Sequence, residues 1–135
     1  FGVVAVGGVA AVVKAIKTFP KCQLLQRGGC GVLRNLTSSN VTGKKQLIES
    51  GGIELLLAAI HNHLDSALLC QHACSALHSI LHGSKENTGR FISLGGAAAV
   101  ANVRTKWPNN DDVQTQVRYL AQLIVAEMKA WADEE

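Results

Sequence analysis

The doublet Gly-Gly occurs three times in this chain at a constant interval of 44 residues. Self-similarity at a fixed interval is the signature of an internal repeat. The doublets are Gly7-Gly8, Gly51-Gly52 and Gly95-Gly96, and the same interval, once or twice, separates Cys30 from Cys74 and Pro20 from Pro108. The sequence therefore predicts about three copies of one structural unit.

Each unit is expected to be helical. Apolar residues at Val9, Val12, Val13 and Ile16 follow the i, i+3, i+4, i+7 pattern of an amphipathic helix. Because aromatic residues make up only 4%, the core must consist mostly of small aliphatic side chains, which favour packed helices over a strand-rich sandwich. Helices are predicted over residues 9–19, 24–37, 42–50, 53–62, 67–81, 87–94, 97–106 and 111–131. The chain is thus predicted to be all-α, one domain with repeats at about 1–38, 39–82 and 83–135.

Three glycines lie inside the helix expected at 24–37, namely Gly28, Gly29 and Gly31. Each costs about 1 kcal/mol relative to alanine in a helix interior. They either let a neighbouring helix come close or make this helix locally weak. The residues expected to face inward are Leu25, Gly29, Val32, Leu33 and Leu36.

The third unit replaces apolar residues of the other two units by charged ones. The equivalent positions are Ile16, Ile60 and Arg104; Leu24, Leu68 and Asp112; and Cys30, Cys74 and Arg118. Because the outer face of a terminal repeat must be wettable, residues 111–135 are predicted to cap the C-terminal end. The N-terminal end remains apolar, which predicts either further repeats before it or self-association through Phe1, Val3, Val4 and Val6.

The order of a short helix, Gly-Gly, a middle helix, a turn and a long third helix resembles the armadillo repeat. The closest local match is Gly31-Val32-Leu33-Arg34-Asn35-Leu36-Thr37, followed by residues 44–53. This resemblance covers essentially the whole chain. It implies a right-handed α-solenoid of armadillo-like repeats.

The resemblance also implies an extended peptide in a groove lined by the third helices, gripped by asparagine side chains. An amide suits this task because it offers a donor and an acceptor together. Asn35 stands at the matching position; its other reading is a hydrogen bond to a neighbouring loop. Together with Gly31, the residues placed along such a groove are Arg27, Arg34, Asn35, Gln71, Ser75, Ser79, Thr115, Tyr119 and Gln122.

The chain departs from the nuclear-import branch of this family. Ser79 and Leu123 stand at the positions equivalent to Asn35. The tryptophan expected one turn earlier is replaced by Gly31, Ser75 and Tyr119. A receptor for nuclear localisation signals is therefore not predicted.

Cys70, Cys74, His78 and His82 are spaced four residues apart, an order that could hold zinc. However, the three steps of four residues that separate them spread the four side chains over about 120° around a helix. A Cys–His nucleophilic pair would also lack an orienting acid and an oxyanion element. The glycine-rich runs lack the lysine and the strand of a phosphate loop. The sequence predicts no metal, no cofactor and no enzymatic activity.

Charge and cysteine usage restrict the partners. Net charge is +3, and basic residues such as Lys14, Lys17 and Arg27 concentrate in the first unit. They either form a solvated basic face or, where they converge, receive an acidic peptide. Nucleic acid is not expected because few aromatic residues are available to stack on bases. No membrane-spanning segment is expected. Cys30 and Cys74 are read as buried, reduced thiols, which predicts an intracellular protein, cytoplasmic or nuclear.

Two functions remain open from the sequence. The leading one is a non-catalytic protein-interaction module that binds a peptide or a partner surface along the third-helix face. The alternative is a structural or self-assembly segment that associates through its apolar N-terminal end.

Overall fold

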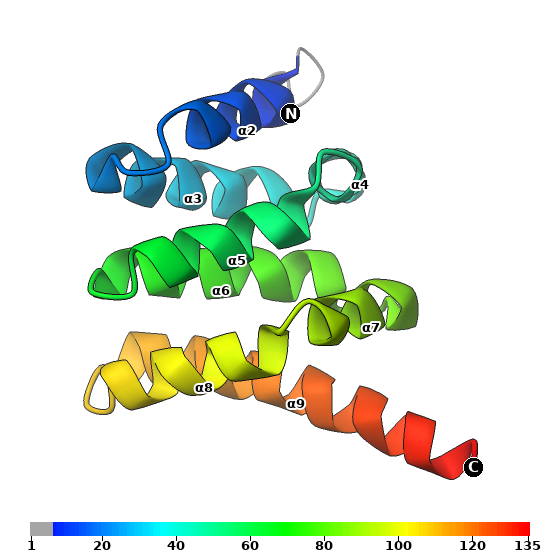
Figure 1. Cartoon of the computed structure of the whole chain (residues 1–135). Helices are drawn as coiled ribbons and strands as arrows, with labels where there is room; N and C mark the ends of the chain where they lie inside the picture. The colour runs from blue at the N-terminus through cyan, green and yellow to red at the C-terminus, as the bar shows by residue number, and fades with distance from the viewer. Residues whose placement is uncertain (1–6) are drawn as a thin grey trace.

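The computed structural model describes residues 7–135, and in these residues it contains eight α-helices and no β-strand. In chain order they are α2 (Gly8–Thr18), α3 (Gln23–Thr37), α4 (Val41–Glu49), α5 (Gly52–Asn62), α6 (Ala67–Leu81), α7 (Lys85–Ser93), α8 (Gly96–Lys106) and α9 (Asp111–Asp133) (Figure 1). The all-α prediction is confirmed. The apolar segment that contains Phe1, Val3, Val4 and Val6 lies outside the described residues.

Helices of equal length recur at the 44-residue interval. The helices α2, α5 and α8 each have 11 residues. The helices α3 and α6 each have 15, and α4 and α7 each have 9. The last helix, α9, begins 44 residues after α6 and continues for 23 residues. Most expected boundaries agree with these within one or two residues.

Figure 1 shows the helices stacked in pairs, α2 with α3, α5 with α6 and α8 with α9. The helices α4 and α7 lie at one end of the stack, between successive pairs. The most extensive contacts join α3 to α6 and α6 to α9. The core between these helices consists of small and aliphatic side chains that are fully buried, among them Cys30, Leu33, Leu69, Ala73, Cys74, Leu77 and Leu120. None of the helices in residues 7–135 combines the length and hydropathy needed to cross a membrane.

The Gly-Gly doublets meet two structural requirements, a left-handed backbone conformation at the first glycine and, at Gly52 and Gly96, a close contact with the preceding helix. Gly7, Gly51 and Gly95 have φ of 84°, 78° and 91°, a left-handed conformation that residues with a side chain disfavour, and each is the N-cap residue of a middle helix, α2, α5 or α8. The second glycines Gly52 and Gly96 lie against the preceding short helices, α4 and α7. A Cβ on Gly52 would lie 2.6 Å from the carbonyl oxygen of Leu47, and one on Gly96 would overlap the ring of Phe91.

Two glutamines, 88 residues apart, close the ends of middle helices. Gln26 Nε2 donates to the carbonyl oxygens of Ile16 at 2.8 Å and Phe19 at 2.9 Å. Gln114 Nε2 donates in the same way to Arg104 at 3.1 Å and Trp107 at 2.8 Å. The last carbonyls of a helix have no partner within the helix, so these side chains satisfy them.

Two ring nitrogens bond the turn of one unit to the turn of the unit before it. His63 Nε2 lies 2.7 Å from the carbonyl oxygen of Pro20, and since a carbonyl only accepts, the imidazole donates. Trp107 Nε1 donates to the carbonyl oxygen of Leu64 at 2.9 Å. His63 and Trp107 are 44 residues apart, as are their acceptors. Trp107 also packs against the hydrophobic core, so it anchors the turn of the third unit to the second unit.

The inward face expected for α3 is partly wrong. Val32 is 42% exposed, whereas the polar Gln26 is only 2% exposed because it reaches the carbonyls of α2. The packing role expected for the glycines holds for Gly29, where a Cβ would lie 2.8 Å from Ile16 Cδ1, and for Gly31. It does not hold for Gly28, which has nothing within 4 Å of a Cβ.

The charged residues of the third unit, Arg104, Asp112 and Arg118, are exposed as expected. The expectation assumed that the apolar equivalents of these residues are buried in the first two units. For Asp112 this is wrong, because its equivalents Leu24 and Leu68 are exposed too, at 70% and 45%. In α6 and α9 the next residue along the chain points inward instead: Leu69, after Leu68, and Val113, after Asp112, are fully buried.

Replacing Gly52 by alanine should destabilise the fold, because the new Cβ meets the backbone of Leu47 and overpacking costs about 1–3 kcal/mol. Gly28→Ala, in open space on α3, is the matched control and should stabilise by about 0.5–1 kcal/mol. Urea unfolding of both variants measures the difference. Equal effects of the two substitutions would contradict the close approach at Gly52.

Candidate functional site

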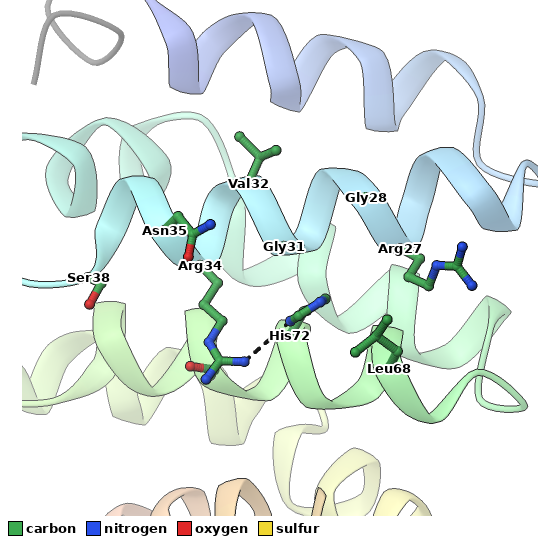
Figure 2. A pocket seen from close by; sticks show the side chains of 10 residues that line it. Arg27, Gly28, Gly31, Val32, Arg34, Asn35, Ser38, Leu68 and His72 are labelled. Carbon is green, nitrogen blue, oxygen red and sulfur yellow. Dashed lines mark hydrogen bonds between the residues drawn. The ribbon is translucent and has the colours of Figure 1, made fainter. Parts of the chain in front are cut away.

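A pocket of about 650 Å³ lies between α3 and α6 (Figure 2). We call it the α3–α6 pocket. Ten residues line it: Arg27, Gly28, Gly31, Val32, Arg34, Asn35 and Ser38 from α3 and its C-terminal end, and Leu68, His72 and Ser75 from α6.

Helical spacing explains why these residues meet. On α3, Arg27, Gly31 and Arg34 are four and three residues apart and therefore share one side of the helix. On α6, Leu68, His72 and Ser75 have the same spacing. Since α3 packs along α6, the two rows face each other across the pocket.

The absence of a side chain at Gly31 makes room for the ring of His72. A Cβ at residue 31 would lie 3.2 Å from Cδ2 and 3.3 Å from Nε2 of His72, tighter than an ordinary contact. Any larger residue would push the ring away from α3. The glycine that weakens α3 as a helix therefore shapes the pocket.

Arg34 and His72 form the polar contact across the pocket. Arg34 Nη1 lies 3.3 Å from His72 Nδ1, and Figure 2 shows the two side chains pointing toward one another. Because a guanidinium only donates, His72 Nδ1 accepts, and the neutral ring carries its proton on Nε2. Burial, followed by the charges of Arg34 and Arg27, lowers the pKa of His72 below its ordinary value.

The pocket has a positive electrostatic character. Arg27 and Arg34 contribute two guanidinium groups, and no aspartate or glutamate is among the ten lining residues. The exposed side chain of Asn35 makes no hydrogen bond to the residues that the structure describes. The pocket can therefore offer charged donors to an anion and an amide to a peptide backbone.

The structure brings together part of the predicted groove. Arg27, Arg34, Asn35 and Ser75 line the α3–α6 pocket, together with Gly31. The other predicted residues, Gln71, Ser79, Thr115, Tyr119 and Gln122, do not line it.

The outlying residues have different surroundings. Gln71 and Ser79 are partly buried on α6, and Thr115 donates to the carbonyl oxygen of Asp111 in its own helix. The ring of Tyr119 lies 5.4 Å from that of His78, between centroids. Gln122 is exposed on α9. Five of the ten predicted residues therefore line one pocket between two helices, and the other five lie outside it.

Five residues that line the pocket were absent from the sequence-based prediction, namely Gly28, Val32, Ser38, Leu68 and His72. His72 lies four residues after Leu68 and three before the predicted Ser75, so helical spacing alone could have placed it on this face. Ser38 follows the end of α3 and has no periodicity to mark it. The contact with Arg34 carried no sequence signal, because it joins residues 38 apart.

Three of the four cysteines are buried thiols, and Cys22 is exposed. Cys30, Cys70 and Cys74 are fully buried. Burial raises the pKa of Cys30 to about 12 and that of Cys70 to about 11, and also raises that of Cys74. Protonated thiols are weak nucleophiles and weak metal ligands.

The His and Cys residues of α6 do not converge. The ring centroids of His78 and His82 are 5.3 Å apart, and His82 is exposed while Cys70 and Cys74 are in the core. Within residues 7–135 there is no group of three or more His, Cys, Asp or Glu side chains arranged to hold a metal ion.

The chain has been compared with protein-family models, with curated proteins and with solved structures, and nothing matches in any of the three comparisons.

The lowered pKa of His72 predicts a pH dependence of stability. The unfolded chain, with a histidine pKa of about 6.5, binds more protons than the folded chain. This contribution is therefore fully present above about pH 6.5 and is lost as the pH falls through the lowered pKa. The free energy of unfolding should drop less between neutral pH and about pH 5 in His72→Gln than in the wild type.

The control is His61→Gln, an exposed histidine on α5 outside the pocket. Urea unfolding across this pH range measures both variants. If His72→Gln and the wild type have parallel profiles, the environment assigned to His72 is wrong.

Proposed function

We propose that this chain is a non-catalytic protein-interaction module that binds an extended acidic peptide segment in the α3–α6 pocket. The supporting observation is one pocket that combines Arg27, Arg34 and Asn35 and has no carboxylate among its lining residues. We place this pocket on a right-handed armadillo-like α-solenoid of about three repeats. The recurrence of equal helices every 44 residues supports that architecture.

The two arginines favour more than one acidic side chain. Arg27 and Arg34 are seven residues apart on α3, which is about 10 Å along the helix axis. An extended chain advances about 3.3 Å per residue, so acidic residues three or four apart span the same distance. Guanidinium–carboxylate hydrogen bonds are among the stronger polar contacts and have defined geometry.

Asn35 complements this charge recognition. It is adjacent to Arg34, and its amide can bond both the N–H and the C=O of a peptide backbone. Such a bond fixes the peptide's position without reading its sequence. Specificity would then come from the arginines, and the backbone grip from Asn35.

The same features favour an intracellular setting, cytoplasmic or nuclear. All four cysteines are free, and three of them are buried in the core. Reduced thiols of this kind are typical of compartments that keep cysteine reduced.

A peptide-display selection against this chain tests the proposal. The wild type should enrich peptides with paired acidic residues, and Arg34→Ala should weaken a selected peptide by on the order of tenfold or more, the usual effect of removing a charged hydrogen-bond donor. Asn35→Ala should weaken peptides of different sequence to a similar extent. Fluorescence anisotropy with the selected peptide measures both.

Arg104→Ala, an exposed arginine on α8, is the matched control and should leave affinity unchanged. No enrichment, or a consensus that survives both pocket substitutions, would remove the support for a peptide site here.

A further inference from the structure

The helix α9 carries a second exposed surface that the proposed peptide site does not use. Its core is an apolar shallow surface formed by Arg118, Ala121, Gln122, Val125 and Ala126, which we call the α9 face. Val125 is 65% exposed, and Met128, one turn further along, is 50% exposed. In Figure 1 this helix runs along the edge of the molecule and its C-terminal half extends beyond α8.

The residues equivalent to the α9 face, found at the 44-residue interval in α6 and α3, are buried. Val125 corresponds to Leu81 and Thr37, and Ala121 corresponds to Leu77 and Leu33, all four of which are fully buried in α6 and α3. In α3 and α6 this face is covered by the helices that follow. In α9 no other part of the described structure covers it. The α9 face is thus a packing surface without a partner.

Charge restricts the partner. Arg118 occupies the position of Cys74 and Cys30, both fully buried. A second copy stacked head to tail would place its α2 and α3 over this arginine. Those two helices contain no aspartate or glutamate, so the arginine would be covered without a counter-charge, which is unfavourable.

An antiparallel arrangement of two α9 helices supplies the counter-charge. Arg118 and Asp133 lie at equal distances, about 11 Å along the axis, on either side of the midpoint between Val125 and Ala126. A two-fold axis at that midpoint brings Arg118 of each copy opposite Asp133 of the other, twice by symmetry. The same axis places Val125 opposite Ala126 and Gln122 opposite Lys129, so no like charges meet.

We propose that this chain forms a two-fold symmetric dimer through antiparallel pairing of the α9 face, with Val125 and Ala126 at its centre and Arg118–Asp133 ion pairs at its ends. This surface is separate from the α3–α6 pocket, since the two share no residue. The dimer would therefore present two peptide sites at once, and it does not depend on the proposed peptide binding.

Sedimentation equilibrium of the chain over a wide range of concentration tests the dimer. The wild type should approach twice the chain mass and stop there. Val125→Asp should be monomeric over the same range, because it places a charge at the centre of the pair. Val41→Asp is the matched control, an 81% exposed valine on α4, and should dimerise like the wild type. Circular dichroism establishes that both variants are folded.

The ion pairs are tested by charge reversal. Arg118→Glu should raise the dimer dissociation constant on the order of tenfold or more, because it faces Asp133 of the other copy twice. Combining it with Asp133→Arg should restore the wild-type value. Arg34→Ala, in the peptide pocket, should leave the dissociation constant unchanged.

Three results would overturn the proposal. They are a wild type that stays monomeric at every concentration, a dimer that persists in Val125→Asp, and a mass that keeps rising as head-to-tail stacking would produce. Failure of the double charge reversal to rescue association would overturn the antiparallel register.

Discussion

The structure depends on the close contact between each short helix and the middle helix that follows it. At this junction the chain must turn through a left-handed residue and then pass against the preceding helix with no room for a side chain. Gly51 meets the first demand and Gly52 the second, against Leu47. Gly95 and Gly96 repeat the solution against Phe91. Only glycine adopts a left-handed conformation without steric strain and has no Cβ to clash with the preceding helix. This explains why the doublet recurs in all three units while most neighbouring residues differ between them.

At other equivalent positions of the repeat, different side chains donate a hydrogen bond to the same backbone carbonyl oxygen. The turn after each middle helix leaves carbonyl oxygens to be satisfied, and an imidazole at His63 and an indole at Trp107 donate to equivalent ones. Gln26 and Gln114 close the ends of α2 and α8, but the middle unit has Cys70 there, whose Sγ lies 3.7 Å from the carbonyl oxygen of Leu64. What recurs is the buried acceptor and the need to pair it, and not the identity of the donor.

The α3–α6 pocket shows where prediction from sequence succeeds and where it stops. The family resemblance placed Arg27, Arg34 and Asn35 along a groove, and all three line the pocket. None of the expected residues on α9 lines the pocket, which is formed by residues of α3 and α6. His72 became part of it through its contact with Arg34 and the missing side chain at Gly31. Both depend on how far apart the two helix axes lie, which helical periodicity within one helix does not contain.

The sequence by itself determined the elements: helices at nearly their observed positions, an all-α fold, a 44-residue interval, and charged exposed residues such as Arg118 in the last unit. These are local properties, set by periodicity and by glycine and proline. The tertiary structure decided which side of each element is buried. It exposed Val32 and Leu24, buried Gln26 and left Val125 uncovered, although the equivalents of Val125 lie in the core. The physical reason is that burial depends on the neighbouring helix, and the residues of a neighbouring helix can be far away along the chain, as with Arg34 and His72, which are 38 residues apart.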